Sequence, residues 1–379
     1  MIRILREAVI VAGSMAQRPH HGGHAWVFLQ YLLGFRRLGF DVLFVDRLDP
    51  GMDADESNVA FLAALMERFG LADSWAVLLD GGRDIAGRPR SEVVEMARRS
   101  VLLLNVMGYL DDDEILAAAP LRAFLDIDPG FGQMWHELGL ADLFGGHDRH
   151  VTVGQGIGGR RCSVPTCGID WITTLPPVEL SEWPRGAQHD GRFTSVVSWR
   201  GPFGPVDYDG RRYGLRVHEF RRFLKLPAQT GERFEVALDI DDGDRADAES
   251  LERHGWMLAD PRAVAGDPWR YRDYVRRSAA ELMIAKNLYV DTRSGWFSDR
   301  SACYLASGRP ALVQDTGLEG VLPLGEGLLA FSDPAEATAA VKEVRADYDR
   351  HSRAARAIAE EHFAAQRVLR RLLEELGVR

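Results

Sequence analysis

The stretch that decides the fold runs from Lys286 to Pro310 and reads KNLYVDTRSGWFSDRSACYLASGRP. Its apolar start, Leu288 to Asp291, predicts a short strand, and Asp299 to Ala306 predicts a helix. The glycine and serine residues between them predict a strand-to-helix turn. Such a turn exposes the first backbone amides of the helix, which favours binding of an anion there.

Short apolar strands alternate with amphipathic helices on both sides of this stretch. The first series predicts strands at 8–12, 41–45, 75–79, 101–106 and 123–126, separated by helices at 25–38, 57–69, 92–99 and 113–118. The second predicts strands at 194–199, 234–239, 288–291, 311–313 and 328–331, helices at 215–223, 269–285 and 299–306, and a long helical tail at 334–376. Prolines at 176, 177 and 184 separate the two series. The pattern predicts an α/β protein with two Rossmann-like domains built on parallel sheets.

Composition excludes several classes of protein. With 46% apolar and 27% charged residues, the 379-residue chain can build ordinary globular cores. The net charge of −10 argues against a nucleic-acid partner. Three cysteines and a start without a leader pattern predict a cytoplasmic protein, and no apolar run is long enough for a transmembrane segment.

Two other motifs suggest a cofactor or a metal site, but the surrounding sequence does not support either. Residues 154–159 read GQGIGG, which matches a dinucleotide fingerprint, but Pro165 and the glycines around it leave no room for the helix that the fingerprint requires. Cys162 and Cys167 have no companion ligands at the spacing of a zinc site. We therefore expect no nicotinamide or flavin cofactor and no metal.

The segment RSGWFS at 293–298, followed by a helix and Gly308-Arg309-Pro310, resembles the donor-site signature of GT-B glycosyltransferases. In those enzymes a His-x-Gly-Trp-x-Ser segment holds the pyrophosphate of a nucleotide sugar. Arg293 stands where that histidine would be, and the paired glutamates of another branch are absent from Gly295 and Cys303. The resemblance implies a donor site in the second half.

This resemblance, together with positions at strand ends, identifies several candidate residues for binding the donor. They are Arg200, Lys286, Arg293, Gly295, Trp296, Ser298, Thr316 and Glu319. Arg293 offers a guanidinium fork for phosphate, and Arg200 follows the first strand of the second half. Lys286 stands at the predicted end of the 269–285 helix, where a charge that complements the helix dipole is the better interpretation. Thr316 could equally belong to a plain turn.

The opening of the chain carries a second match. Gly22-Gly23-His24, a helix closed by Arg37-Leu38-Gly39, and the strand at 41–45 resemble the start of the same superfamily. In inverting members that histidine is the general base, so the role falls on His24; a helix N-terminus would lower its pKa and keep it neutral. A capping or loop role is the alternative. Asp126 and Asp128 end a predicted strand, where either could orient His24 or contact the acceptor. For Asp128 the favoured alternative is an ordinary turn formed by Asp128-Pro129-Gly130.

The resemblance implies the GT-B architecture: an acceptor-binding domain at 1–180, a nucleotide-sugar-binding domain at 186–358, and a C-terminal helix at 359–379 that crosses back. It further implies a metal-independent glycosyltransferase, of hexosyltransferase type, that moves a sugar from a UDP or TDP donor to a small-molecule or glycan hydroxyl. A nucleotide-sugar epimerase and a non-catalytic nucleotide-sugar-binding protein remain alternatives. The sequence leaves open the donor sugar, the base of the nucleotide, the identity of the acceptor, and whether the anomeric configuration is inverted or retained.

Overall fold

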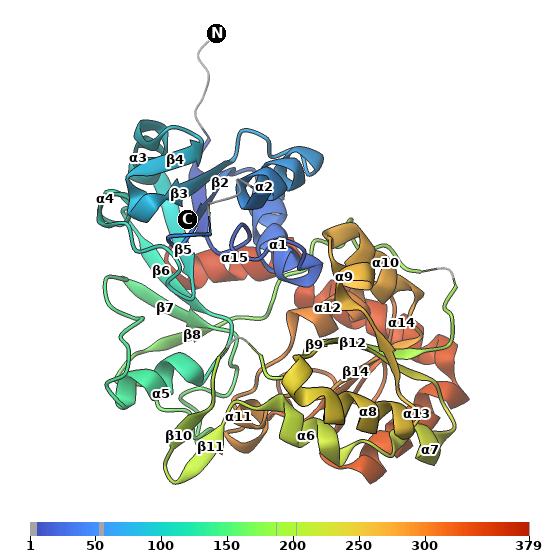
Figure 1. The fold of residues 1–379 in the computed structure, drawn as a ribbon. Helices are drawn as coiled ribbons and strands as arrows, with labels where there is room; N and C mark the ends of the chain where they lie inside the picture. Colours follow the sequence, from blue (N-terminus) through green and yellow to red (C-terminus); the bar gives the residue numbers. More distant parts are fainter. Residues whose placement is uncertain (1–5, 53–56, 187, 202, 379) are drawn as a thin grey trace.

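Two parallel sheets, one in each half of the chain, form the framework of the protein (Figure 1). The computed structural model describes residues 6–52, 57–186, 188–201 and 203–378. Within these ranges no helix is both long and apolar enough to cross a bilayer.

The first sheet has eight strands in the order β4-β3-β2-β1-β5-β6-β7-β8, and only the β3–β4 pair is antiparallel. The strands are β1 (Ala8–Ala12), β2 (Asp41–Arg47), β3 (Trp75–Leu79), β4 (Asp84–Gly87), β5 (Ser100–Val106), β6 (Arg122–Asp126), β7 (Arg149–Thr152) and β8 (Trp171–Thr173). The helices are α1 (Gly22–Leu38), α2 (Ser57–Arg68), α3 (Arg90–Arg98), α4 (Asp113–Ala118), α5 (Phe131–Glu137) and the 3₁₀ turn η1 (Asp80–Gly82).

The central strand β1 shows why this sheet needs helices on both faces. All five of its residues are buried: Val9 and Val11 join the core beneath α1, while Ala8 and Ile10 join the core beneath α3. Because successive side chains point to opposite faces, a wholly apolar strand is stable only when both faces are covered. Gly39, at a φ of 102°, ends α1 and turns the chain into β2.

The second sheet has six parallel strands in the order β13-β12-β9-β14-β15-β16. The strands are β9 (Phe193–Ser198), β12 (Phe234–Asp239), β13 (Met257–Ala259), β14 (Ala280–Met283), β15 (Ala311–Gln314) and β16 (Leu328–Phe331). The helical segments are α6 (Arg216–Arg222), α7 (Leu226–Thr230), η2 (Asp242–Asp244), α8 (Arg245–Arg253), α9 (Pro261–Ala265), α10 (Pro268–Arg277), α11 (Asn287–Asp291), α12 (Asp299–Ala306) and α13 (Pro334–Ala346). A hairpin of β10 (Val206–Tyr208) and β11 (Arg211–Tyr213) packs against α5 of the first half.

The end of the chain returns to the first half. It comprises α14 (Tyr348–Ile358), a π-helical turn η3 (Ala359–Phe363) and α15 (Ala365–Glu375). Figure 1 shows α15, in red, among the blue and cyan elements of the first half. Its buried Leu369 lies against α1 so closely that a Cβ on Gly34 would come within 2.5 Å of it. The predicted crossing-back helix is confirmed.

Two predicted elements are wrong. The helix predicted at 269–285 ends at Arg277 in α10, and residues 280–283 form β14 in the middle of the sheet. Ser278 leaves helical geometry with a ψ of 151°. Burial of all four β14 residues outweighs the helical preference of their side chains. The strand predicted at 288–291 is therefore helix α11, and Lys286 precedes this helix instead of ending the previous one.

Candidate functional site

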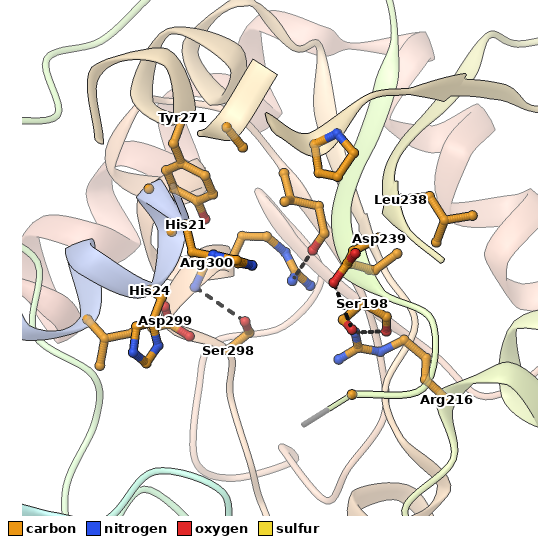
Figure 2. A pocket seen from close by; sticks show the side chains of 18 of the residues that line it. His21, His24, Ser198, Arg216, Leu238, Asp239, Tyr271, Ser298, Asp299 and Arg300 are labelled. Atoms are coloured by element: carbon orange, nitrogen blue, oxygen red, sulfur yellow. Dashed lines mark hydrogen bonds between the residues drawn. The ribbon is translucent and has the colours of Figure 1, made fainter. Parts of the chain in front are cut away.

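A cavity of about 790 Å³ lies between the two halves, at the carboxyl ends of β9 and β12 (Figure 2). The first turn of α1 closes it from the first half, and the first turn of α12 closes it from the second. Strand order reverses at β9, with β12 on one side and β14 on the other. Open α/β sheets bind ligands at such a switch point, because the loops there diverge and leave a crevice.

The start of α12 presents polar groups to this cavity. Ser298 caps the helix, its Oγ accepting a hydrogen bond from the Arg300 backbone N–H at 3.2 Å. Asp299 follows as the first helical residue, and burial raises the pKa of its carboxyl to about 6. The positive end of the helix dipole therefore faces the cavity.

Arg300 is held in place by hydrogen bonds to two strands of the second sheet, β14 and β9. Its Nε–H donates to Glu281 Oε1 at 2.6 Å, and its Nη1 donates to the Val196 carbonyl at 2.7 Å. Glu281 is completely buried in β14. Arg300 Nη2 has no hydrogen-bond partner among the described residues. The guanidinium is thus fixed on two sides and keeps one donor group unused beside the cavity.

Arg216, the first residue of α6, is the least compensated cation of the site. It is 8% exposed, and burial lowers its pKa to about 10, with the nearby charge of Arg300 adding to the effect. Its Nη1 makes a long hydrogen bond of 3.4 Å to the Ser198 carbonyl, while its Nε has no partner. No described carboxylate forms an ion pair with it. Burying an uncompensated charge is costly, which favours an anionic ligand at this position.

A third cation ties the two halves together. Lys286 Nζ lies 3.0 Å from Asp128 Oδ1, and the Tyr289 hydroxyl also donates to that carboxylate. Lys286 is 5% exposed; burial lowers its pKa, although Asp128 opposes this effect. Trp296 stacks on Tyr289 and donates from Nε1 to the Ile127 carbonyl at 3.3 Å. The loop after β6 therefore contacts the segment around Lys286 and Trp296 in the second half.

His24 lines the cavity from the first turn of α1. Its Nε2 lies 3.0 Å from both the carbonyl oxygen and Oγ of Ser14. A carbonyl only accepts, so Nε2 carries the proton and Nδ1 keeps a free lone pair. The pKa of His24 is lowered to about 4, first by burial and then by the charge of Arg18. The direction agrees with the prediction, but burial is the main cause.

The structure brings four of the ten predicted catalytic and donor-binding residues to the cavity. His24, Lys286, Trp296 and Ser298 all line the cavity, as does Asp128. Asp126 does not. Its carboxylate, although its pKa is raised to about 6 by burial, accepts hydrogen bonds from Gln133 at 2.8 Å and Thr152 at 3.0 Å. It shapes the loop that carries Asp128.

The remaining predicted donor residues are not part of the cavity lining. Arg200 is paired with Asp244, and Arg293 turns toward Asp315 at 3.5 Å. Glu319 is exposed beside Arg161 at 3.7 Å. Thr316 is buried, and its hydroxyl donates to the Trp296 carbonyl at 2.6 Å.

Gly295 has a structural role that links it to the rejected dinucleotide motif. Gly156 N–H donates to the Ser294 carbonyl at 2.9 Å, and Gln155 N–H donates to the Gly295 carbonyl at 3.3 Å. A Cβ on Gly295 would come within 2.5 Å of the Gly156 nitrogen. The glycines of both motifs therefore allow the two halves to meet backbone to backbone.

Sequence reasoning missed Arg216, Asp299 and Arg300. Asp299 and Arg300 directly follow the predicted Ser298, so the predicted start of the helix could have identified them as site candidates. Arg216 carried no such signal, because it lies far from every motif along the chain. Among the residues that the structure describes, no group of three His, Cys, Asp or Glu side chains is arranged to hold a metal ion.

No protein-family model and no curated protein matches this sequence. Solved structures match it over nearly the whole chain. HepE from Anabaena, in complex with UDP-glucose, is 12% identical with a TM-score of 0.58, covering 98% of this chain and 99% of that one. Sucrose-phosphate synthase from Thermosynechococcus elongatus is 12% identical with a TM-score of 0.56 and the same coverage. A mutant of TarM from S. aureus, in complex with fondaparinux, alpha-GlcNAc-glycerol and UDP, is 7% identical with a TM-score of 0.60, again covering 98% and 99%. Since these neighbours are GT-B glycosyltransferases and the match spans both sheets and the returning helix, the chain has the GT-B fold, two Rossmann-like halves facing each other across a cleft.

Proposed function

We propose that this protein is a glycosyltransferase that moves a sugar from a nucleoside diphosphate donor to an acceptor hydroxyl in the cavity between its halves. One observation carries the proposal: the buried Arg216, without a described carboxylate partner, faces the same cavity as the N-terminus of α12. A diphosphate supplies the charge that both features favour. UDP is the first nucleotide to test, because the HepE structure contains UDP-glucose and the TarM structure contains UDP.

In the proposed reaction the acceptor oxygen attacks the anomeric carbon while the bond from that carbon to the phosphate oxygen breaks. His24 Nδ1 takes the hydroxyl proton, and the nucleoside diphosphate leaves with the bonding electrons. Arg216, Lys286 and the start of α12 stabilise the charge that develops on the leaving group. We propose that these cations serve in place of a metal ion.

Titration calorimetry with UDP tests the donor site. Arg216→Met keeps much of the buried stem and removes the charge. We expect it to weaken UDP binding by about 1.5–3 kcal/mol, the range for hydrogen bonds to charged groups. Arg200→Met is the matched control: it removes a cation from the same half that is already paired with Asp244, and we expect less than a twofold change. Equal losses in both variants would mean that Arg216 contributes only bulk charge.

A turnover assay separates the transferase from the alternatives. A nucleotide-sugar epimerase would change the donor sugar without any acceptor, whereas a transferase releases UDP at the rate of glycoside formation. A binding protein without activity would bind UDP and turn over no acceptor. We therefore expect UDP release that depends on the acceptor.

A further inference from the structure

A second cavity of about 590 Å³ adjoins the first, and we call it the side cavity. It lies between α2 of the first half and the α9–α10 segment of the second. His20 and Arg262 line both cavities. A molecule seated in the side cavity would therefore reach the edge of the proposed reaction site.

The wall of the side cavity is fixed to the helix that carries His24. Trp26, on α1, donates from Nε1 to the Pro268 carbonyl at 2.8 Å. A Cβ on Gly22 would come within 2.2 Å of the Asp267 carbonyl oxygen, so the two backbones touch. The side cavity thus has a fixed position relative to the first turn of α1.

The lining combines an apolar wall with arginine side chains. Phe61, Leu65 and Trp269 provide the apolar surface. The guanidinium of Arg68 lies over the Trp269 ring, 3.4 Å from its centroid. Stacking of this kind orients the guanidinium and leaves the N–H groups at its edge available for a planar anion.

The positive charge of the side cavity is largely uncompensated by described residues. Neither Arg68 nor Arg262 has an ion pair or a side-chain hydrogen bond to a described residue. The lining carboxylate, Asp267, caps α10 by accepting from the backbone N–H groups of Trp269 and Arg270, at 3.0 and 2.9 Å. It also pairs with the Arg270 side chain at 3.2 Å.

We propose that the side cavity is the acceptor subsite and that it selects acceptors in which a flat apolar body carries a carboxylate. The proposal rests on the glycosyltransferase function above and adds the chemical class of its acceptor. The apolar wall covers the flat body, and Arg68 with Arg262 binds the carboxylate, while the hydroxyl to be glycosylated points past His20 toward His24.

Fluorescence titration with 6-hydroxy-2-naphthoate and with its neutral amide tests this assignment. We expect the wild-type protein to bind the carboxylate at least tenfold more tightly than the amide. Arg68→Met and Arg262→Met should each cut that ratio severalfold or more. Arg98→Met, on α3 at a distance from both cavities, is the matched control and should keep the ratio. Arg262 is exposed on α9, so its variant remains informative if Arg68→Met disturbs the Trp269 contact.

UDP competition distinguishes this subsite from the donor site. We expect saturating UDP to leave naphthoate binding in place and Arg68→Met to leave UDP affinity unchanged. Equal binding of acid and amide, no saturable binding of either, or displacement of the naphthoate by UDP would each overturn the acceptor assignment. Failure of the protein to bind UDP would instead count against the proposed function.

Discussion

The two sides of the main cavity are built differently. On the side of the second half, Arg216, Lys286 and Arg300 are each less than 10% exposed and held by buried elements. On the side of the first half, His20 and His21 are exposed in a loop, and His24 is only partly buried. The second half thus offers a rigid, positively charged surface, whereas the first half offers imidazole side chains, two of them exposed. A tightly bound anionic donor suits the former, and an exchanging hydroxyl acceptor suits the latter.

The largest expected effect tests the histidine side of this comparison. His24→Ala should reduce kcat by roughly 10²–10⁴-fold, the usual contribution of a positioned base, and leave UDP affinity unchanged. Ser14→Ala should cost far less, because the Ser14 carbonyl still holds Nε2. Because the pKa of His24 is lowered to about 4, kcat of the wild type should stay level from pH 8 to roughly pH 5 and fall below that.

The anomeric configuration of the product, determined by NMR, gives a second test of the base role of His24. An inverted product agrees with a base on the acceptor side. A retained anomer together with near-normal turnover of His24→Ala would remove the base role and leave the fold and the donor site untouched.

A smaller effect tests the rigidity of the cavity wall that the second half provides. Gly295 has a φ of 69°, and a Cβ there would collide with the Gly156 backbone; Gly320 has a φ of 78° with nothing near its Cβ position. Gly320→Ala should therefore cost only the backbone strain, roughly 1–2 kcal/mol. Gly295→Ala should lower the Tm clearly more and weaken UDP binding, because it also pushes apart the two halves. Calorimetric melting curves give the comparison, and equal Tm losses would show that the close approach is not needed.

The smallest effect concerns the loop that positions Ser14. Asp46 accepts hydrogen bonds from the Ala16 and Arg47 backbone N–H groups, and burial raises the pKa of its carboxyl to about 7. A raised carboxyl pKa means that the folded state binds the proton more tightly than the unfolded state, so Asp46 lowers stability as pH rises from about 4 through 7. We expect the Tm difference between Asp46→Asn and wild type to shift in favour of the variant over this range. A constant difference would show that the carboxyl ionises normally.

The segment at 293–298 shows which positions could be placed at the cavity from the sequence and which could not. The sequence pointed to Ser298 and Trp296 because a glycine-rich turn before an apolar helix is a local pattern, which adjacent residues are enough to reveal. Arg293, beside them in the chain, turns away at a φ of 50°, so its neighbours alone could not reveal its direction. Strand β14 was mistaken for helix because its side chains favour helix, whereas its place between β9 and β15 is a property of the whole sheet.

By itself the sequence determined the α/β class, the two halves, the serine-capped start of α12 and the position of His24 on α1, since each depends on patterns within some twenty residues. Only the tertiary structure decided which charges meet. It paired Lys286 with Asp128 across the cleft, satisfied Arg200 with Asp244, and left Arg216 buried without a described carboxylate partner. The energy of a buried charge depends on the groups around it in space, and residues far apart in the chain supply those groups.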